Sequence, residues 1–301
     1  MRKKIVITGA VGSVISRVIP ELKKDYDLVL LVRNNIDSSG KPMEGVHSVD
    51  LATTPRDEYR QYFKGADMVM HTAYSFVPRR KSPNDSMDIR APSLDDFRYG
   101  VALEDITMTF NIMRTAMEEG LKRAIVFSSN HAAGYYEYLI KKGVLETVTE
   151  DMVPYAISFY GWSKICQEAL GHMFASGSDT SGRKLEVIMI RFGAPRTDLI
   201  ENVTSDSYYM LRRHFGSYMS ERDELQMLKL CIEKEDIRDE NGIPFQLFYG
   251  TSDNHNRIWS LRNARQFGYE PQDSSYMDFP ERIKKLFAEA VDKEIERKKN
   301  G

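Results

Sequence analysis

Short apolar runs alternate with helical stretches through the first two thirds of this 301-residue chain, and this alternation limits the possible fold more than any other feature. Runs of this length are typical of strands buried on both faces of a sheet. They lie at Lys4–Thr8, Asp27–Arg33, Val46–Val49, Asp67–His71, Ala124–Phe127 and Leu185–Arg191. Repeated strand–helix units predict an α/β protein with a doubly wound parallel sheet, whose ligands bind at the carboxyl ends of the strands.

The last third of the chain has a looser rhythm. Ser220 followed by Asp223 predicts the start of a helix that runs to about Glu233, and Phe245–Tyr249 has the pattern of a late strand. Glu281–Lys298 is an amphipathic helix pattern with a basic end. We therefore predict a core at residues 1–190 and a smaller region at residues 191–301, interleaved with the core.

The segment Ser75–Tyr99 interrupts the alternation with prolines and charged residues. A connection of this length inside a compact domain is often a functional lid. A surface insertion explains the same composition, and the sequence leaves both interpretations open.

Composition excludes several classes of protein. A net charge of −2 leaves no basic excess to neutralise nucleic-acid phosphates. The two cysteines, Cys166 and Cys231, lack metal-ligand spacing and fit reduced thiols in a cytoplasmic protein. No run approaches the roughly 20 apolar residues of a membrane span, and the N-terminal run is too short for a signal peptide. We therefore expect no nucleic-acid, membrane or metal partner.

A glycine-containing turn, Thr8-Gly9-Ala10-Val11-Gly12, follows the first predicted strand and is expected to open the first helix. Small residues here let the backbone approach a pyrophosphate, which the N–H groups and dipole of a helix N-terminus attract. A plain glycine turn is the alternative. We predict that the dinucleotide contacts are Gly9, Val11, Gly12, Ser13 and Val14. Ile15 replaces the usual third glycine, so the helix is expected to pack less closely.

The end of the second strand is where a dinucleotide's adenosine ribose is recognised. An acidic residue there favours NAD, whereas a basic one accommodates the 2′-phosphate of NADP. This chain has Arg33, which favours NADP and leaves NAD possible; a surface arginine is the alternative. Asp50 and Leu51 follow the third strand, where Asp50 is placed to accept from the adenine amino group or merely to form a turn.

Tyr160 and Lys164 are four residues apart and lie on one face of a predicted helix. A free tyrosine with a pKa of about 10 is a poor base at neutral pH, and a nearby ammonium lowers that pKa. A phenolate can take the proton of an alcohol while hydride leaves the same carbon for nicotinamide. An ordinary surface pair on a helix has the same spacing, so the Tyr160–Lys164 pair indicates catalysis only together with other motifs in the chain.

These other motifs are the glycine turn and a serine pair at the end of the fifth strand. Ser128 and Ser129 precede Asn130 and His131, at the carboxyl edge of the predicted sheet. A hydroxyl at this edge can hydrogen-bond a reacting substrate oxygen and stabilise developing charge. Two serines that merely end a strand are the alternative.

Together these motifs resemble the extended short-chain dehydrogenases of the NAD-dependent epimerase/dehydratase family, with the Rossmann-type fold. The motifs are T-G-x-x-G, His71-Thr72-Ala73, the serine pair, Y-x-x-x-K and an arginine-ended strand before Pro195. The resemblance implies Ser129, Tyr160 and Lys164 as catalytic residues, and a homodimer. It also implies further cofactor contacts at Thr72, Ala73, Tyr160, Lys164, Phe192, Gly193 and Ala194.

A narrower resemblance is to the uronate dehydrogenases. It rests on S-S-N-H-x-x-G-Y-Y, Y-G-x-S-K, and the runs at residues 249–254 and 268–274. It implies a sugar or sugar-acid substrate, bound in the smaller region and by residues that include Ser75, Asn130 and His131.

Two features depart from the uronate pattern, and a third departs from the pattern of the broad family. Those enzymes carry an acidic residue where this chain has Arg33, and Asp105 stands where the broad family has an asparagine. The carboxylate-reading arginine is displaced, so that Arg212 or Arg213 either binds an anion or is surface charge; we take Arg212 as the substrate residue.

Two other functions fit parts of the sequence. A sugar-nucleotide epimerase or dehydratase would retain NAD without net redox change. A regulator that senses NADP without catalysis fits the Ile15 departure, but it has no need for an intact Ser129, Tyr160 and Lys164 set.

Overall fold

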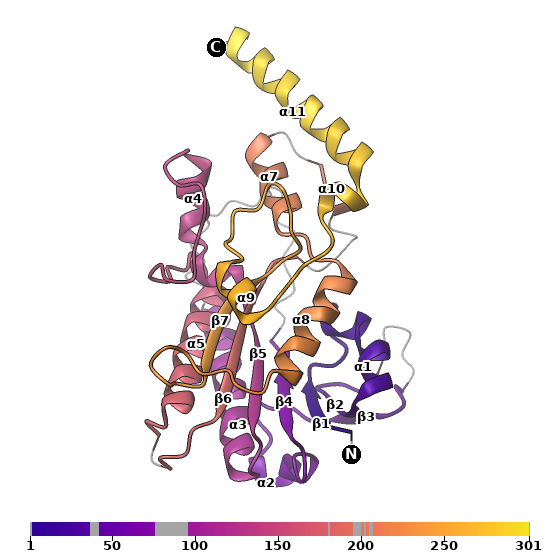
Figure 1. Cartoon of the computed structure of the whole chain (residues 1–301), viewed down its shortest axis with the longest axis vertical. Coiled ribbons are helices and arrows are strands. Elements are labelled where there is room, and N and C mark those ends of the chain that lie inside the picture. The colour runs from indigo at the N-terminus through magenta and orange to yellow at the C-terminus, as the bar shows by residue number, and fades with distance from the viewer. Residues whose placement is uncertain are drawn as a thin grey trace. The chain divides into compact units, whose positions relative to one another are not determined.

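A computed structural model describes residues 2–36, 42–75, 96–179, 181–194, 200–201, 203–204 and 207–300. Within these residues, seven strands form one sheet in the order β3-β2-β1-β4-β5-β6-β7 (Figure 1). The strands are β1 (Lys4–Thr8), β2 (Asp27–Val32), β3 (Val46–Ser48), β4 (Met68–His71), β5 (Arg123–Ser129), β6 (Glu186–Phe192) and β7 (Phe245–Gly250). The predicted doubly wound, Rossmann-type sheet is confirmed.

The helices are α1 (Ile19–Asp25), α2 (Arg56–Tyr59), α3 (Asp96–Glu118), α4 (Tyr135–Lys141), α5 (Phe159–Ser176), α7 (Tyr208–Gly216), α8 (Glu221–Glu233), α9 (Arg262–Phe267), α10 (Ser275–Asp278) and α11 (Pro280–Asn300). Three short 3₁₀ helices are η1 (Ile15–Arg17), η2 (Arg60–Tyr62) and η3 (Asn130–Ala133). The chain divides into two compact units. The first holds residues 1–134, 154–190 and 235–247, and the second holds residues 135–153, 191–234 and 248–301.

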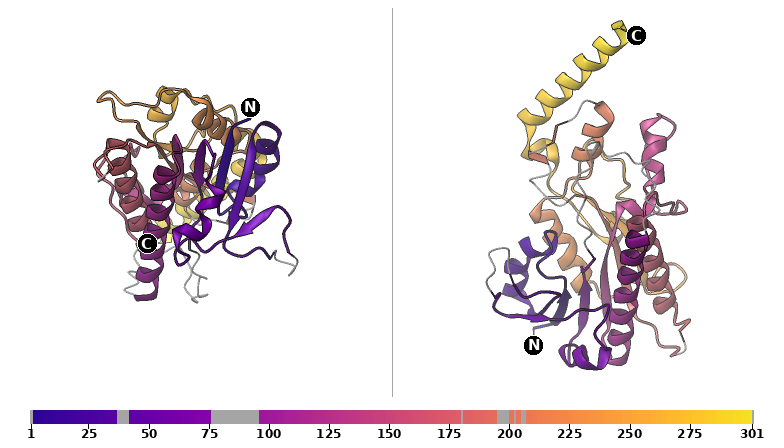
Figure 2. Two further views of the ribbon diagram at one scale, coloured as in Figure 1. Left: turned by 90° about the horizontal axis from the view of Figure 1, so that it is seen from below. Right: turned by 180° about the vertical axis from the view of Figure 1, so that it is seen from behind.

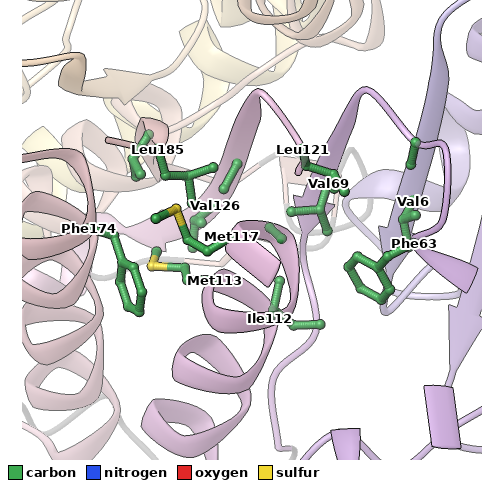
Figure 3. Close-up of a cluster of buried hydrophobic side chains, with 14 of the residues drawn as sticks. Val6, Phe63, Val69, Ile112, Met113, Met117, Leu121, Val126, Phe174 and Leu185 are labelled. Carbon is green, nitrogen blue, oxygen red and sulfur yellow. The ribbon is translucent and has the colours of Figure 1, made fainter. Parts of the chain in front are cut away.

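The first unit buries one face of its sheet under α3 and α5, which pack against each other (Figure 2). Because successive strand residues point to opposite faces, every second residue of a strand meets these helices. Figure 3 shows the resulting cluster, in which Val6, Val69 and Val126 of the sheet lie with Ile112 and Met113 of α3 and with Phe174 of α5. This core fixes the strand ends that carry the polar residues described below.

The start of the first helix differs from the prediction. The glycine turn is followed by η1, and α1 begins only at Ile19, with Pro20 in its first turn. Ile15 is fully buried at the start of η1. A buried isoleucine fills the space that a third glycine would leave for close helix packing, so the turn does not lead directly into an α-helix.

The second unit has its own core, made by α7 and α11 with the residues before α7. Leu211 and Phe215 of α7 pack with Ile283, Leu286 and Ala290 of α11, as the amphipathic pattern predicts. The Asn254 amide donates to Gly216 O and Tyr218 O, and its Oδ1 accepts the N–H of Ser275. The run at residues 249–254 therefore holds together separate segments of this unit.

Candidate active site

The glycine turn is held tightly at the carboxyl end of β1. Gly9 has φ +70°, and a Cβ there would lie 2.6 Å from the backbone of Ala73, so no other residue fits without a shift. The N–H of Gly9 donates to Leu31 O at 2.8 Å, and the Thr72 hydroxyl donates to Thr8 O at 2.7 Å. The end of β1 is thus clamped from β2 on one side and from β4 on the other.

The remaining predicted dinucleotide residues lie around this turn. Val11 and Ser13 are exposed and Val14 is half-buried. Leu51 is buried, whereas Asp50 Oδ1 accepts the N–H of Ala52 at 3.0 Å in a local turn. The turn-forming role of Asp50 is therefore present, and its contact with adenine stays a prediction.

Arg33 follows β2 and reaches residues of three other segments. Its Nη2 donates to Ser75 Oγ at 3.0 Å and lies 3.7 Å from Glu104 Oε2. Its Nε lies 3.7 Å from Asp50 Oδ2. Arg33 is therefore a half-exposed guanidinium between two carboxylates, at the same edge of the sheet as the glycine turn.

Ser129, Tyr160 and Lys164 are brought together at the carboxyl end of β5. The Ser129 hydroxyl caps η3 by accepting the N–H of His131 at 3.2 Å. Tyr160 lies in the first turn of α5, whose N-cap is Ser158. Lys164 Nζ donates to Phe127 O at 3.0 Å and to Gln167 Oε1 at 3.2 Å, and it lies 5.6 Å from the centre of the Tyr160 ring.

The electrostatics of Tyr160 differ from the expectation. Burial raises the pKa of Tyr160 to about 12; a hydrogen bond with Ser129 opposes this rise and the charge of Asp105 adds to it. Although 37% of Tyr160 is exposed, its hydroxyl lies in this enclosed polar group. The Lys164 ammonium is held by Phe127 O and Gln167, and the pKa of Tyr160 is raised rather than lowered as the sequence predicted.

Burial also lowers the pKa of Lys164, whereas the carboxylates of Asp105 and Glu168 raise it. Burial lowers the pKa of His71 to about 3, with Lys164 adding to the effect, so His71 is neutral at physiological pH. Its Nδ1 is 2.7 Å from the Thr8 hydroxyl. Neutral His71 therefore joins the ends of β1 and β4.

The glycine of Y-G-x-S-K explains how the serine end and the tyrosine helix meet. A Cβ on Gly161 would lie 2.3 Å from His131 O, so only glycine lets η3 pack this closely on α5. The His131 and Tyr160 rings meet edge to face, 5.7 Å apart, and Asn130 is buried. Both predicted substrate residues thus lie close to Tyr160, and their contact with a substrate stays a prediction.

Two residues of α3 join this site. Asp105 is buried and its Oδ1 accepts the N–H of Ser75 at 2.6 Å, and Glu104 Oε2 accepts the Ser75 hydroxyl at 2.9 Å. Asp105 was a position of interest in the sequence, whereas Glu104 was not predicted. An adjacent pair of acidic residues early in α3 was the available signal, but the broken pattern before it hid where the helix begins.

Known proteins are similar to this chain over nearly its whole length. It is 26% identical to the NAD-dependent glucose-6-phosphate dehydrogenase of Haloferax volcanii, in an alignment that covers 91% of this chain and 95% of that protein. It is also 26% identical to an L-arabinose 1-dehydrogenase (NAD(P)⁺) of the same organism, over 90% of this chain and 97% of that protein. The uronate dehydrogenase of Pseudomonas syringae pv. tomato is 25% identical, over 90% of this chain and 82% of its own length.

Along about nine tenths of its length, the chain is therefore similar to uronate dehydrogenases and to other NAD-dependent sugar dehydrogenases. No protein-family model matches it. Its fold matches the glucuronic acid dehydrogenase structure from Chromohalobacter salexigens with a TM-score of 0.68 at 21% identity, over 95% of this chain and 90% of that one. The structure of a mutant uronate dehydrogenase of Agrobacterium tumefaciens complexed with NAD matches with a TM-score of 0.67 at 19% identity, over 95% of this chain and 90% of that one.

The remaining predicted cofactor residues belong to the second unit. Phe192 ends β6, the N–H of Gly193 donates to Gly250 O at 3.0 Å, and Ala194 pairs with Tyr218 in a parallel bridge. These contacts hold the segment firmly after β6. Its place against a nicotinamide stays a prediction.

The two displaced arginines of α7 have different partners. Arg213 forms a buried, two-pronged ion pair with Glu137 of α4, and its guanidinium lies 5.9 Å from the Trp259 ring. Arg212 Nη2 donates to Glu146 O at 3.1 Å. Arg213 is therefore part of the interior of the second unit.

Among the residues that the structure describes, no group of histidine, cysteine and carboxylate side chains is arranged to hold a metal ion. None of the helices in that part of the chain is long and apolar enough to cross a membrane. Most of the proposed lid, residues 76–95, lies outside the described residues, so only Ser75 and the first turns of α3 are seen from it.

Proposed function

We propose that this protein oxidises a hydroxyl group of a sugar or sugar acid, or reduces the matching carbonyl, with a nicotinamide cofactor. The observation that carries this proposal is the meeting of Ser129, Tyr160 and Lys164 at the same sheet edge as the Gly9 turn. The sugar dehydrogenases to which the chain is similar support the sugar class and the use of NAD or NADP.

Each catalytic residue has a distinct part in this reaction. Tyr160, once ionised, takes the proton of the substrate hydroxyl, and Ser129 donates a hydrogen bond to the same oxygen. Lys164 is held by Phe127 O and Gln167, which keeps its ammonium beside the tyrosine and available to a nicotinamide ribose. The nicotinamide, when bound, accepts the hydride.

The residues present fit a dinucleotide. Val11 and Ser13 of the turn are exposed, and only glycine at position 9 allows the turn to pack against the backbone of Ala73. A tight turn of small residues with accessible backbone is what a pyrophosphate requires. Arg33 lies where the adenosine ribose is recognised, and we therefore propose a preference for NADP, with NAD as a possible second cofactor. Leu51, Thr72 and Ala73 complete the proposed cofactor site.

For the substrate, we propose Ser75, Asn130, His131 and Arg212 as contact residues. Because Glu137 already neutralises Arg213, Arg212 is the arginine of α7 that we assign to an anionic sugar. We further propose that residues 191–301 form the substrate-binding region, and that the protein is a cytoplasmic homodimer.

A panel of neutral aldoses, sugar phosphates and uronates with NAD⁺ and NADP⁺ tests the proposed reaction. Net formation of NADH or NADPH, followed at 340 nm, supports a dehydrogenase. The structure also resembles a UDP-galactose 4-epimerase, with a TM-score of 0.60 over 97% of this chain and 99% of that one. Conversion of a sugar without net cofactor reduction would favour that second function and contradict ours.

A further inference from the structure

The Arg33 side chain reaches from the end of β2 to Ser75, beside the proposed dinucleotide turn. Arg33 follows β2, and Ser75 follows β4; β1 lies between these strands and pairs with both. Neighbouring strands are about 4.8 Å apart, so β2 and β4 are separated by roughly 10 Å. The hydrogen bond of 3.0 Å between Arg33 Nη2 and Ser75 Oγ therefore spans the carboxyl end of β1.

The Gly9–Gly12 turn lies at that same end of β1. Its backbone is placed between Leu31 of β2 and Ala73 after β4. A pyrophosphate at this turn, with its adenosine toward the end of β2, would lie beside the Arg33 side chain. In that arrangement, the guanidinium would have to leave Ser75 to make room for the cofactor.

Glu104 holds the far end of this arm. Its Oε2 lies 3.7 Å from Arg33 Nη2 and accepts the Ser75 hydroxyl at 2.9 Å, so one carboxylate joins both partners. Ser75 is itself fixed, because its N–H donates to the buried Asp105. Asp50 lies 3.7 Å from Arg33 Nε. Because Asp50 follows β3, which is next to β2, this contact does not draw the guanidinium toward β4.

We infer that Glu104 and Ser75 hold Arg33 across the cofactor site, so that Arg33 opposes the binding of NAD more than that of NADP. This inference rests on the proposed cofactor use. Both dinucleotides must displace the arm. The 2′-phosphate of NADP then replaces Glu104 as the partner of the guanidinium, whereas the 2′-hydroxyl of NAD offers no charge in return.

Titration of the purified full chain with NADPH and NADH, followed by cofactor fluorescence, tests the arm. In Arg33→Ala we expect NADPH to bind at least about tenfold more weakly and NADH about two- to fivefold more tightly, since exposed ion pairs of this kind are worth about that factor. An arginine that only reads the 2′-phosphate leaves NADH binding unchanged, and that result would overturn the inference.

Glu104→Gln tests the anchor. We expect both cofactors to bind about two- to fivefold more tightly, and we expect this gain to vanish in the Arg33→Ala, Glu104→Gln double variant. A gain of equal size in both backgrounds means that Glu104 acts without Arg33, and contradicts the inference. Failure of either cofactor to bind the unaltered protein instead contradicts the proposed function.

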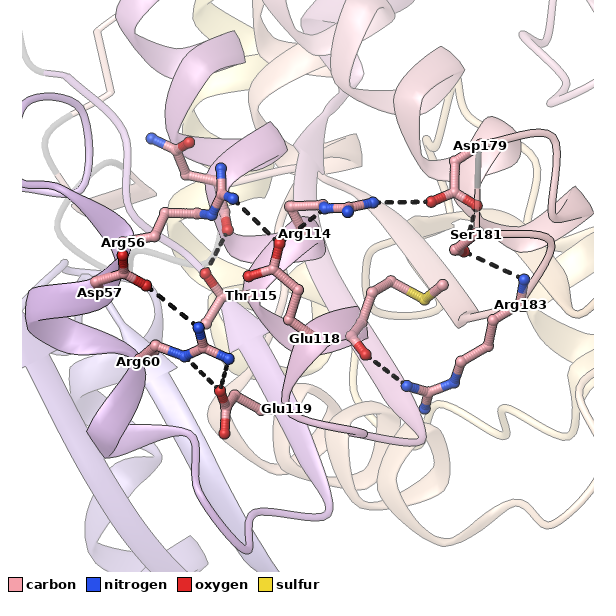
Figure 4. Close-up of polar contacts among 12 residues, drawn as sticks. Arg56, Asp57, Arg60, Arg114, Thr115, Glu118, Glu119, Asp179, Ser181 and Arg183 are labelled. Carbon is pink, nitrogen blue, oxygen red and sulfur yellow. Dashed lines mark hydrogen bonds and ion pairs between the residues drawn. The ribbon is translucent and has the colours of Figure 1, made fainter.

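Glu118→Gln is the matched control. Glu118 lies on the same helix and pairs with Arg56 at 3.1 Å and Arg114 at 2.9 Å, in the polar group of Figure 4 away from the glycine turn. Its loss removes a comparable charge and should leave both affinities unchanged. A cofactor-free melting curve for each variant shows whether a change in affinity comes from a change in folding.

Discussion

Tyr160 is the residue on which the proposed chemistry depends, and its surroundings oppose ionisation. Burial is the largest cause of its raised pKa, which lies at about 12, and the charge of Asp105 raises it further. At neutral pH the phenol is protonated, so alcohol oxidation is expected to rise with pH as phenolate forms. The positive charge of an oxidised nicotinamide would favour the phenolate when the cofactor is bound.

Asp105→Asn should move this pH dependence. The substitution keeps an acceptor for the Ser75 N–H and removes a negative charge that disfavours the phenolate. Because removal of that charge lowers the pKa of Tyr160, the alkaline rise in kcat/KM for oxidation should shift to lower pH. A profile between pH 6 and pH 10 measures the shift, and KM is read alongside.

If Asp105 only anchors the segment at Ser75, the asparagine variant keeps both the wild-type profile and the wild-type KM. Asp105→Ala is the companion variant, since it removes both the charge and the acceptor. It should show the same shift in the pH profile together with a higher KM for the substrate.

At the scale of elements, the contact between η3 and α5 positions Ser129 and Tyr160. A Cβ added at Gly161 would lie only 2.3 Å from His131 O, which is a steric clash. Gly161→Ala should therefore push η3 away, at a cost of about 1–3 kcal/mol in the free energy of unfolding, and reduce activity. Thermal or urea unfolding measures the change in stability.

Gly100→Ala provides the control for that substitution. Gly100 lies in α3, exposed, with open space around an added Cβ. Alanine is the better helix former by about 0.5–1 kcal/mol, so this variant should be as stable as the wild type or more so. A Gly161→Ala protein with wild-type stability and activity would show that the close contact is unimportant.

The sequence was sufficient to place most elements, since buried parallel strands leave short apolar runs. Each expected strand overlaps an observed one, and the Ser220 cap is present, with its hydroxyl accepting the N–H of Asp223. The four-residue spacing of Tyr160 and Lys164 likewise placed both on α5.

Long-range contacts could not be predicted in the same way. The partners of Arg33 come from α3 and from the segments after β3 and β4, and Glu137 pairs with Arg213 from 76 positions away. No local pattern records such pairs. The irregular start of α1 also escaped prediction, because the result depends on how a buried Ile15 packs rather than on helix propensity.

At the scale of the whole molecule, α3 offers a surface for the proposed homodimer. Tyr99, Leu103 and Phe110 are exposed at helical spacing, although Tyr99 also stacks on Trp162 of α5. A large apolar group left exposed along one helix face often marks an interface between subunits.

Phe110→Glu should therefore convert a dimer to a monomer, because a buried charge at an interface is strongly unfavourable. Light scattering coupled to gel filtration measures the mass of both proteins. A wild-type monomer would contradict the homodimer, and a Phe110→Glu dimer would place the interface elsewhere.

The central claim is that this chain transfers a proton through Tyr160 while hydride moves to a nicotinamide. Tyr160→Phe tests it most directly, with turnover of the best sugar measured beside the affinity for NADPH. We predict a loss of kcat of about 10²- to 10⁴-fold with cofactor affinity within about twofold of the wild type. A phenylalanine variant that retains its turnover would contradict the account.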